Sequence, residues 1–84
     1  MSNLKELNLA NNRIEVISHL NELKQLTTIN LSSNRLKEID GLNLPVLTSL
    51  NLDRNQIKVI TGLRGLKKLE ELSLEGNMIE EASM

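Results

Sequence analysis

Few side chains in this sequence could do covalent or metal chemistry. The chain has no cysteine and a single histidine, His19, so it lacks a thiolate nucleophile and a pair of imidazole ligands. Ser32 and Ser33 are adjacent, but no base stands at a plausible position beside them. Asp53 and Glu75 could come near each other, yet an open surface offers no dry pocket for acid–base chemistry. We therefore expect no catalysis, no cofactor and no metal.

The polar side chains that could bind another molecule recur at a regular spacing. They alternate with leucines over short stretches, which is typical of strands that bury one face and expose the other. Arg13 and Arg35 stand at equivalent positions and could grip a carboxylate by forked hydrogen bonds, whereas Asp53 favours a basic patch. The residues predicted to contact a partner are Glu6, Asn8, Arg13, Thr28, Asn30, Ser32, Arg35, Ser49, Asn51, Asp53, Arg54, Glu71, Ser73 and Glu75.

A second interpretation of the same residues stays open. They would then only keep an exposed sheet soluble, without contacting a partner. We favour this interpretation for Asn8, Asn30 and Asn51, because amides at equivalent places on adjacent strands pair with one another.

A fourfold repeat must position these side chains. The copies are LKELNLANNRI from Leu4, LTTINLSSNRL from Leu26, LTSLNLDRNQI from Leu47 and LEELSLEGNMI from Leu69. One coil cannot cover its own leucines, so the same leucines of the next coil must do so, and parallel strands stack. The sequence predicts an α/β solenoid of about four coils, with residues 1–84 as a single domain and the strands on the concave face.

In the segment that follows each copy, the apolar residues have a different spacing. Apolar residues fall three apart, for example at Ile57, Ile60, Leu63 and Leu66. On an α-helix of 3.6 residues per turn this spacing leaves no apolar stripe, whereas it fits short 3₁₀ turns. We expect broken 3₁₀ turns and loops on the convex face.

One asparagine recurs in every copy, where the strand turns into the loop. A primary amide both donates and accepts hydrogen bonds, so stacked asparagines can satisfy turn backbone groups from coil to coil. The predicted structural ladder consists of Asn12, Asn34, Asn55 and Asn77.

The four copies resemble the leucine-rich repeat signature LxxLxLxxNxI/L. The continuation IxxLxxLxx resembles the intracellular 22-residue subclass, typified by a regulatory subunit of protein phosphatase 1. The resemblance covers essentially the whole chain. It implies a protein-binding role, with partners docking on the concave face, and leaves the partner's identity open.

Composition narrows the class of partner. The net charge is −1, so the chain lacks the excess of positive charge that is typical of nucleic-acid-binding domains. No segment approaches the roughly 20 apolar residues of a membrane span, and no signal peptide is visible. Without cysteine there is no disulfide framework. We expect an intracellular setting: cytoplasm, nucleus or cilium.

Both ends of the sequence fall in the middle of a repeat, and neither resembles a cap. We therefore expect either a piece of a longer protein or self-association through uncapped ends. The leading functional hypothesis is a non-catalytic protein-interaction module, a scaffold or regulatory subunit. The alternative is a structural fragment or designed minimal solenoid with no partner of its own.

Overall fold

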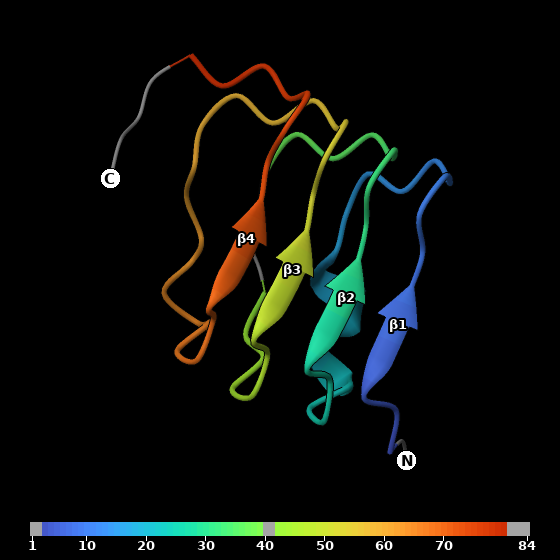
Figure 1. Ribbon diagram of the computed structural model, residues 1–84, viewed down its shortest axis with the longest axis vertical. Coiled ribbons are helices and arrows are strands. Elements are labelled where there is room, and N and C mark those ends of the chain that lie inside the picture. The colour runs from blue at the N-terminus through green and yellow to red at the C-terminus, as the bar shows by residue number, and fades with distance from the viewer. Residues whose placement is uncertain (1–2, 40–41, 81–84) are drawn as a thin grey trace.

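A computed structural model describes residues 3–39 and 42–80, and leaves out the side chains of residues 18 and 19. Its four strands are β1 (Glu6–Asn8), β2 (Thr28–Asn30), β3 (Ser49–Asn51) and β4 (Glu71–Ser73). They form one sheet in the order β1-β2-β3-β4, and every neighbouring pair is parallel (Figure 1). This arrangement fits the solenoid-like repeat fold predicted from the sequence.

Each strand places one apolar side chain inward between two polar ones. Leu7, Ile29, Leu50 and Leu72 pair in register across the sheet. Ile29 and Leu50 are each 1% exposed, because both have a neighbouring coil on either side. Alternation along the chain thus fixes which face of the sheet is dry.

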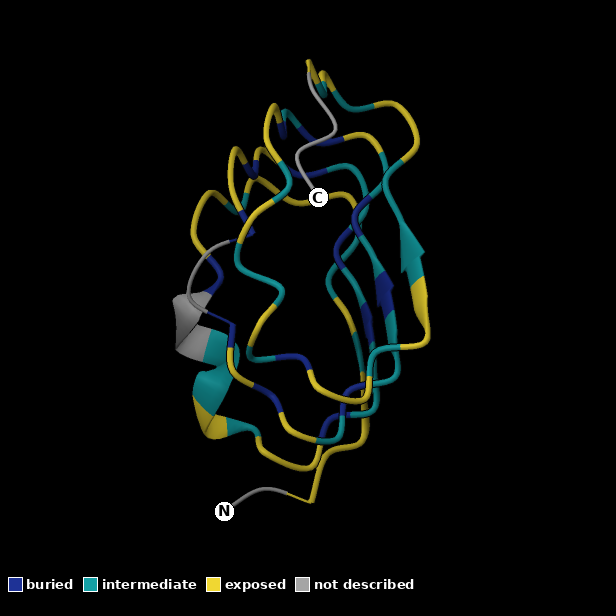
Figure 2. Ribbon diagram, turned by 90° about the vertical axis from the view of Figure 1, so that its left-hand side faces the viewer, coloured by how far each residue is buried: buried dark blue, intermediate teal, exposed yellow. Residues whose placement is uncertain are grey.

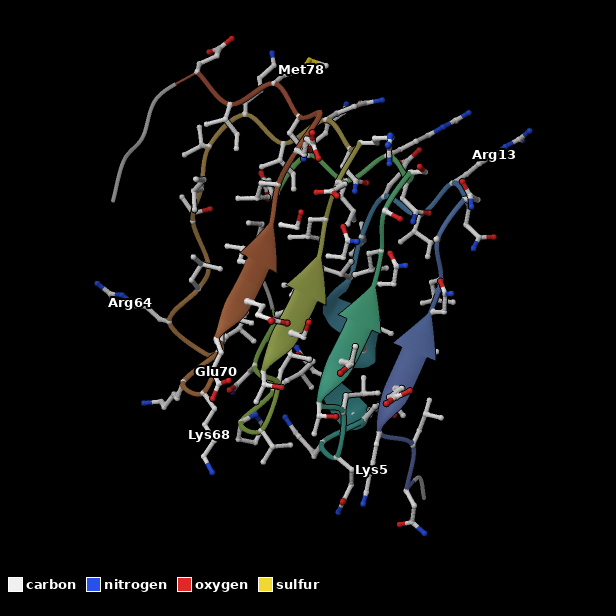
Figure 3. The ribbon with its side chains drawn as sticks, in the orientation of Figure 1. Lys5, Arg13, Arg64, Lys68, Glu70 and Met78 are labelled. Atoms are coloured by element: carbon white, nitrogen blue, oxygen red, sulfur yellow. The ribbon has the colours of Figure 1, made fainter. Side chains whose placement is uncertain are left out.

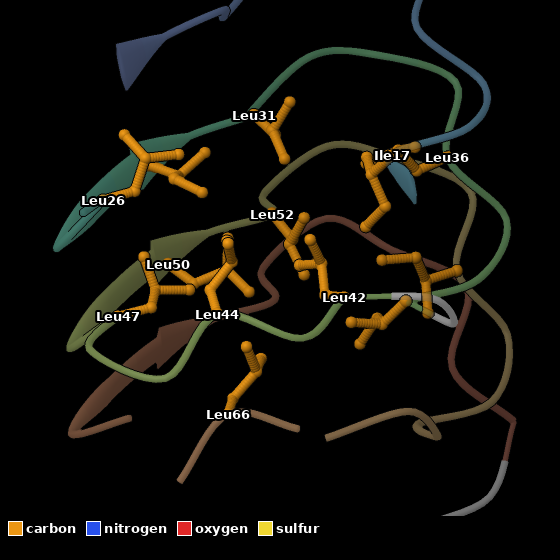
Figure 4. Close-up of a cluster of buried hydrophobic side chains, with 13 residues drawn as sticks. Ile17, Leu26, Leu31, Leu36, Leu42, Leu44, Leu47, Leu50, Leu52 and Leu66 are labelled. Carbon is orange, nitrogen blue, oxygen red and sulfur yellow. The ribbon is translucent and has the colours of Figure 1, made fainter. Parts of the chain in front are cut away.

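The core is a continuous stack of leucine and isoleucine side chains (Figure 4). The fully buried side chains are Leu26, Ile29, Leu31, Leu36, Ile39, Leu44, Leu47, Leu50, Leu52 and Ile57. They all come from the middle of the chain. The equivalent leucines of the first and last coils, such as Leu9 and Leu74, are only partly buried and pack against the stack from its two ends. The centre of the solenoid is therefore its best-packed part.

The side opposite the sheet is made of turns and loops. In the described part of the chain the only helix is η1 (Ser18–Glu22), a 3₁₀ helix, and Figure 2 shows it across the molecule from the strands. Before each of the last three strands a tight turn brings two leucines together, with hydrogen bonds from the N–H of Leu26, Leu47 and Leu69 to the C=O of Leu23, Leu44 and Leu66 at 3.2, 3.3 and 3.3 Å. These turns reflect the apolar spacing of two or three residues, which does not suit an α-helix.

Candidate functional site

The exposed face of the sheet carries two rows of polar side chains that flank the buried row (Figure 3). One row consists of Glu6, Thr28, Ser49 and Glu71, and the other of Asn8, Asn30, Asn51 and Ser73. Members of a row pair directly across neighbouring strands, about 4.8 Å apart. The structure therefore brings together eight of the residues predicted to contact a partner.

The asparagine row is held in a fixed orientation. The side-chain oxygens of Asn8, Asn30 and Asn51 accept hydrogen bonds from the backbone N–H two residues later, at 3.1, 3.0 and 3.0 Å. We expected these amides to pair with one another, and that expectation is wrong. Each turns onto its own chain, because this Asx turn satisfies the backbone as it leaves the sheet. Their Nδ2 groups make no hydrogen bond to the described residues and are left to donate outward.

Ser73 interrupts the asparagine row at β4, and the preceding coil supplies the missing acceptor. Oδ1 of Asp53 accepts the hydroxyl of Ser73 at 2.5 Å and the backbone N–H of Glu75 at 2.8 Å. The N–H of Glu75 is the group that an asparagine at position 73 would bond, by analogy with the first three strands. Asp53, predicted as a partner contact, thus also stabilises the next coil.

Replacing Asp53 by alanine is expected to lower the free energy of unfolding by about 1–2 kcal/mol, because the part-buried hydroxyl of Ser73 and the N–H of Glu75 both lose a charged acceptor. Adding Ser73→Asn should recover more than half of that loss, since the new amide supplies an acceptor from the same strand. Urea unfolding of the wild type, the two single variants and the double variant measures both effects. An alanine variant that the second substitution fails to rescue would contradict this role of Asp53.

Beyond the strands the chain turns sharply at four equivalent residues with positive φ: Asn11, Ser33, Arg54 and Gly76, at 62°, 57°, 55° and 77°. The first three are not glycines, and cross-coil hydrogen bonds hold them in this conformation. Their backbone N–H groups donate to the carbonyls of Ser32, Asp53 and Glu75 at 3.0, 2.8 and 2.7 Å. The predicted contact residues Ser32, Arg54 and Glu75 therefore lie at this turn, past the strands.

The arginines lie at the rim and not on the sheet. Arg13 and Arg35 follow the turn in equivalent positions, and both are exposed. Figure 3 shows Arg13 at the edge of the molecule, pointing away from the strands. A partner on the sheet would therefore contact these guanidinium groups only if it also extended past the turn to the edge of the molecule.

The sheet face itself is acidic. The four strands carry two carboxylates, Glu6 and Glu71, and no lysine or arginine. Asp53 and Glu75 add carboxylates where the chain leaves the sheet, beside Arg54. The hydroxyl of Ser49 donates to Oε1 of Glu71 at 3.1 Å, which restrains that carboxylate. A partner that covers the face at β3 and β4 must bring compensating positive charge or hydrogen-bond donors.

The recurring asparagines lie beneath the turn and join neighbouring coils. Asn55 accepts from the N–H of Leu36 at 3.0 Å and donates to the carbonyls of Leu31 and Leu52, both at 3.0 Å. Asn34 makes the equivalent bonds one coil earlier, and Asn77 one coil later. Asn12, in the first coil, is exposed, and its hydrogen-bond partners among residues 3–39 and 42–80 lie in its own coil: it donates to the carbonyls of Leu9 and Ala10 at 2.9 and 3.2 Å.

Among residues 3–39 and 42–80, no group of three or more His, Cys, Asp or Glu side chains could hold a metal ion. Within the same residues no helix has the length and apolar character needed to cross a membrane. The side chain of His19 lies outside the described part.

Comparison with known protein families identifies the fold family. A family model described as Leucine rich repeat matches residues 24–79, and a second, Leucine Rich repeats (2 copies), matches residues 2–44. The chain belongs to the leucine-rich repeat family. Leucine-rich repeat domains generally mediate protein–protein interaction and are typically non-catalytic. Neither a search of curated proteins nor a search of solved structures gave a match.

Proposed function

We propose that this leucine-rich repeat domain is a non-catalytic interaction module that holds a protein partner on the exposed face of its sheet. The domain would act as a scaffold or a regulatory subunit, with about four coils and the sheet as its concave face. The observation that carries the proposal is the row of Asn8, Asn30 and Asn51, whose amide oxygens are held by the backbone while their N–H donors face outward.

Such a row binds at low entropic cost, because its side chains do not need to be ordered on association. The same hydrogen bonds also satisfy the backbone where each strand ends, so the row serves the fold as well as the proposed contact. The carboxylates of Asp53, Glu71 and Glu75 favour a partner segment with basic residues over the last two strands.

Capture from cell lysate by immobilised wild type and variants tests the proposal. Thr28→Arg with Ser49→Arg places two large cations on the face, at part-buried positions that open to solvent. Gln25→Arg with Asn43→Arg makes the same charge change at exposed positions outside the sheet. The face variant should lose at least about tenfold in yield of a captured protein that the control variant retains.

Equal capture by both variants would count against the sheet face as the binding surface. No selective capture by any of the proteins would favour the alternative, a structural unit without a partner of its own. The melting temperature of each variant must stay close to that of the wild type, so that a loss of binding is not a loss of folding.

Self-association is a competing use of a different surface. Leu4 is 40% exposed and the leucines of β1 and β4 are only partly buried, so apolar area remains at the two ends of the stack. A second copy could cover it. Light scattering over a range of concentrations would reveal this, and a monomer mass that does not change with concentration would count against it.

A further inference from the structure

A second surface lies away from the sheet, on the segments that follow the turn. It is a hollow of about 640 Å³ between neighbouring coils. Met78, one of its lining residues, lies at the edge of the molecule beyond β4 in Figure 3. The described residues that line it are Lys37, Glu38, Gln56, Lys58, Val59, Thr61 and Met78.

The hollow forms where two coils part. After the positive-φ turn, one backbone hydrogen bond joins each coil to the one before it. The N–H of Gln56 donates to the C=O of Leu36 at 2.8 Å, and one coil later the N–H of Met78 donates to the C=O of Ile57 at 3.0 Å. The later pair of coils adds a second bond, from the N–H of Glu80 to the C=O of Lys58 at 3.0 Å. The equivalent bond from Lys58 to Lys37 is not formed, although both residues are described. Among the described residues, the N–H of Lys58 and the C=O of Lys37 therefore have no backbone partner, and both residues line the hollow.

The side chains around this gap combine apolar surface with positive charge. Val59 is 42% exposed and Met78 is 50% exposed, two of the four large apolar side chains exposed in the described part of the chain. Lys37 and Lys58 occupy equivalent positions in neighbouring coils, and neither side chain has an ion pair or a hydrogen bond with the described residues. Among the described lining residues, one carboxylate, Glu38, stands against these two cations.

We propose that this hollow docks an extended acidic segment of a partner protein, in which aliphatic side chains are flanked by carboxylates. The aliphatic groups would cover Val59 and Met78, and the carboxylates would pair with Lys37 and Lys58. The backbone of the segment would bond to the open N–H of Lys58 and C=O of Lys37. The charge preference is opposite to that of the sheet face, so the two surfaces select different partners or different parts of one partner.

A synthetic peptide provides the probe: two central leucines with two aspartates on each side, blocked at both ends and labelled with fluorescein. Binding is followed by anisotropy, and the site is mapped by ¹⁵N–¹H spectra of the labelled protein. We expect saturable binding below about 1 mM, with shifts at the backbone amides of Lys58 and Val59. The same peptide with lysines in place of the aspartates should bind at least about tenfold more weakly.

A pair of double variants separates the site from general charge attraction. Lys37→Glu with Lys58→Glu should weaken binding of the acidic peptide by about tenfold or more. Lys67→Glu with Lys68→Glu makes the same charge change at exposed residues outside the hollow and should alter binding by less than about twofold. All four positions are exposed, so both variants are expected to fold.

Three results would overturn the proposal. They are no saturable binding of the acidic peptide up to about 1 mM, equal losses in the two double variants, and shifts at Asn30 and Asn51 in place of Lys58 and Val59. The last would place the peptide on the sheet face. The first two results do not bear on whether a protein partner docks on that face, so the two proposals can fail separately.

Discussion

Replacing Leu52 by alanine is expected to lower the free energy of unfolding by about 2–5 kcal/mol, more than any surface change in this protein. Leu52 is 0% exposed and lies between the coils of Leu31 and Leu74. Removing its side chain leaves a cavity that both neighbouring coils line. Leu74→Ala removes the same atoms from the last, partly buried coil and should cost only about 1–2 kcal/mol.

Urea unfolding of the two alanine variants at one temperature measures the difference. A domain of this size has little stability to spare, so Leu52→Ala could be unfolded in water. Leu52→Val, which should cost about 1 kcal/mol, then keeps the comparison measurable against Leu74→Val. Equal losses at the two positions would mean that the coils do not cover one another as described.

The second large effect is expected at the asparagine ladder. Asn55→Ala should cost about 1–3 kcal/mol, because the N–H of Leu36 and the carbonyls of Leu31 and Leu52 lose a buried partner. Asn55 is 5% exposed, so water does not readily replace the amide.

Asn12→Ala is the matched control. It removes the same side chain from the exposed first position of the ladder, where the amide donates to Leu9 and Ala10 only. We expect a loss below about 0.5 kcal/mol, because solvent reaches these carbonyls. A loss of only a few tenths of a kcal/mol for Asn55→Ala would contradict the ladder's role in stability.

Much of the sheet could be predicted because two rules act in every copy. Alternation sets which side chains of Thr28, Ile29 and Asn30 turn inward, and the repeat length sets which residue of the next coil lies beside each one. Both rules need only the order of residues along the chain. The rows of polar side chains on the exposed face follow from the same two rules.

The orientation of individual polar groups could not be predicted in this way. Asn30 can bond to a neighbouring amide or to its own backbone, and the choice depends on side-chain torsions that the repeat pattern does not specify. A signal for the bond from Ser73 to Asp53 was nevertheless present. Position 73 holds serine where the other three strands hold asparagine, and the preceding coil holds aspartate at position 53. Together these two residues indicate the bond that the structure shows.

The spacing between coils was also beyond the pattern. A Cβ atom at Gly65 would lie 2.6 Å from the carbonyl oxygen of Leu42 and 3.0 Å from Cα of Asn43, so no larger residue fits without moving the backbone. Elsewhere the coils part and leave the hollow beside Lys37 and Lys58. These differences in the distance between coils arise from the packing around each loop. The repeat pattern is the same in every coil and does not contain them. The 22-residue subclass, the intracellular setting and the expectations for both ends of the chain stay predictions.

The most direct test of the proposed function uses the side-chain amide signals of the asparagines in ¹⁵N–¹H spectra. On addition of a captured partner, the signals of Asn30 and Asn51 should shift, because their N–H groups face outward from the sheet. Those of Asn34 and Asn55 should stay in place, since their N–H groups are committed to buried carbonyls. Unchanged face signals, together with shifts at Asn43 on the opposite side, would contradict a partner site on the sheet.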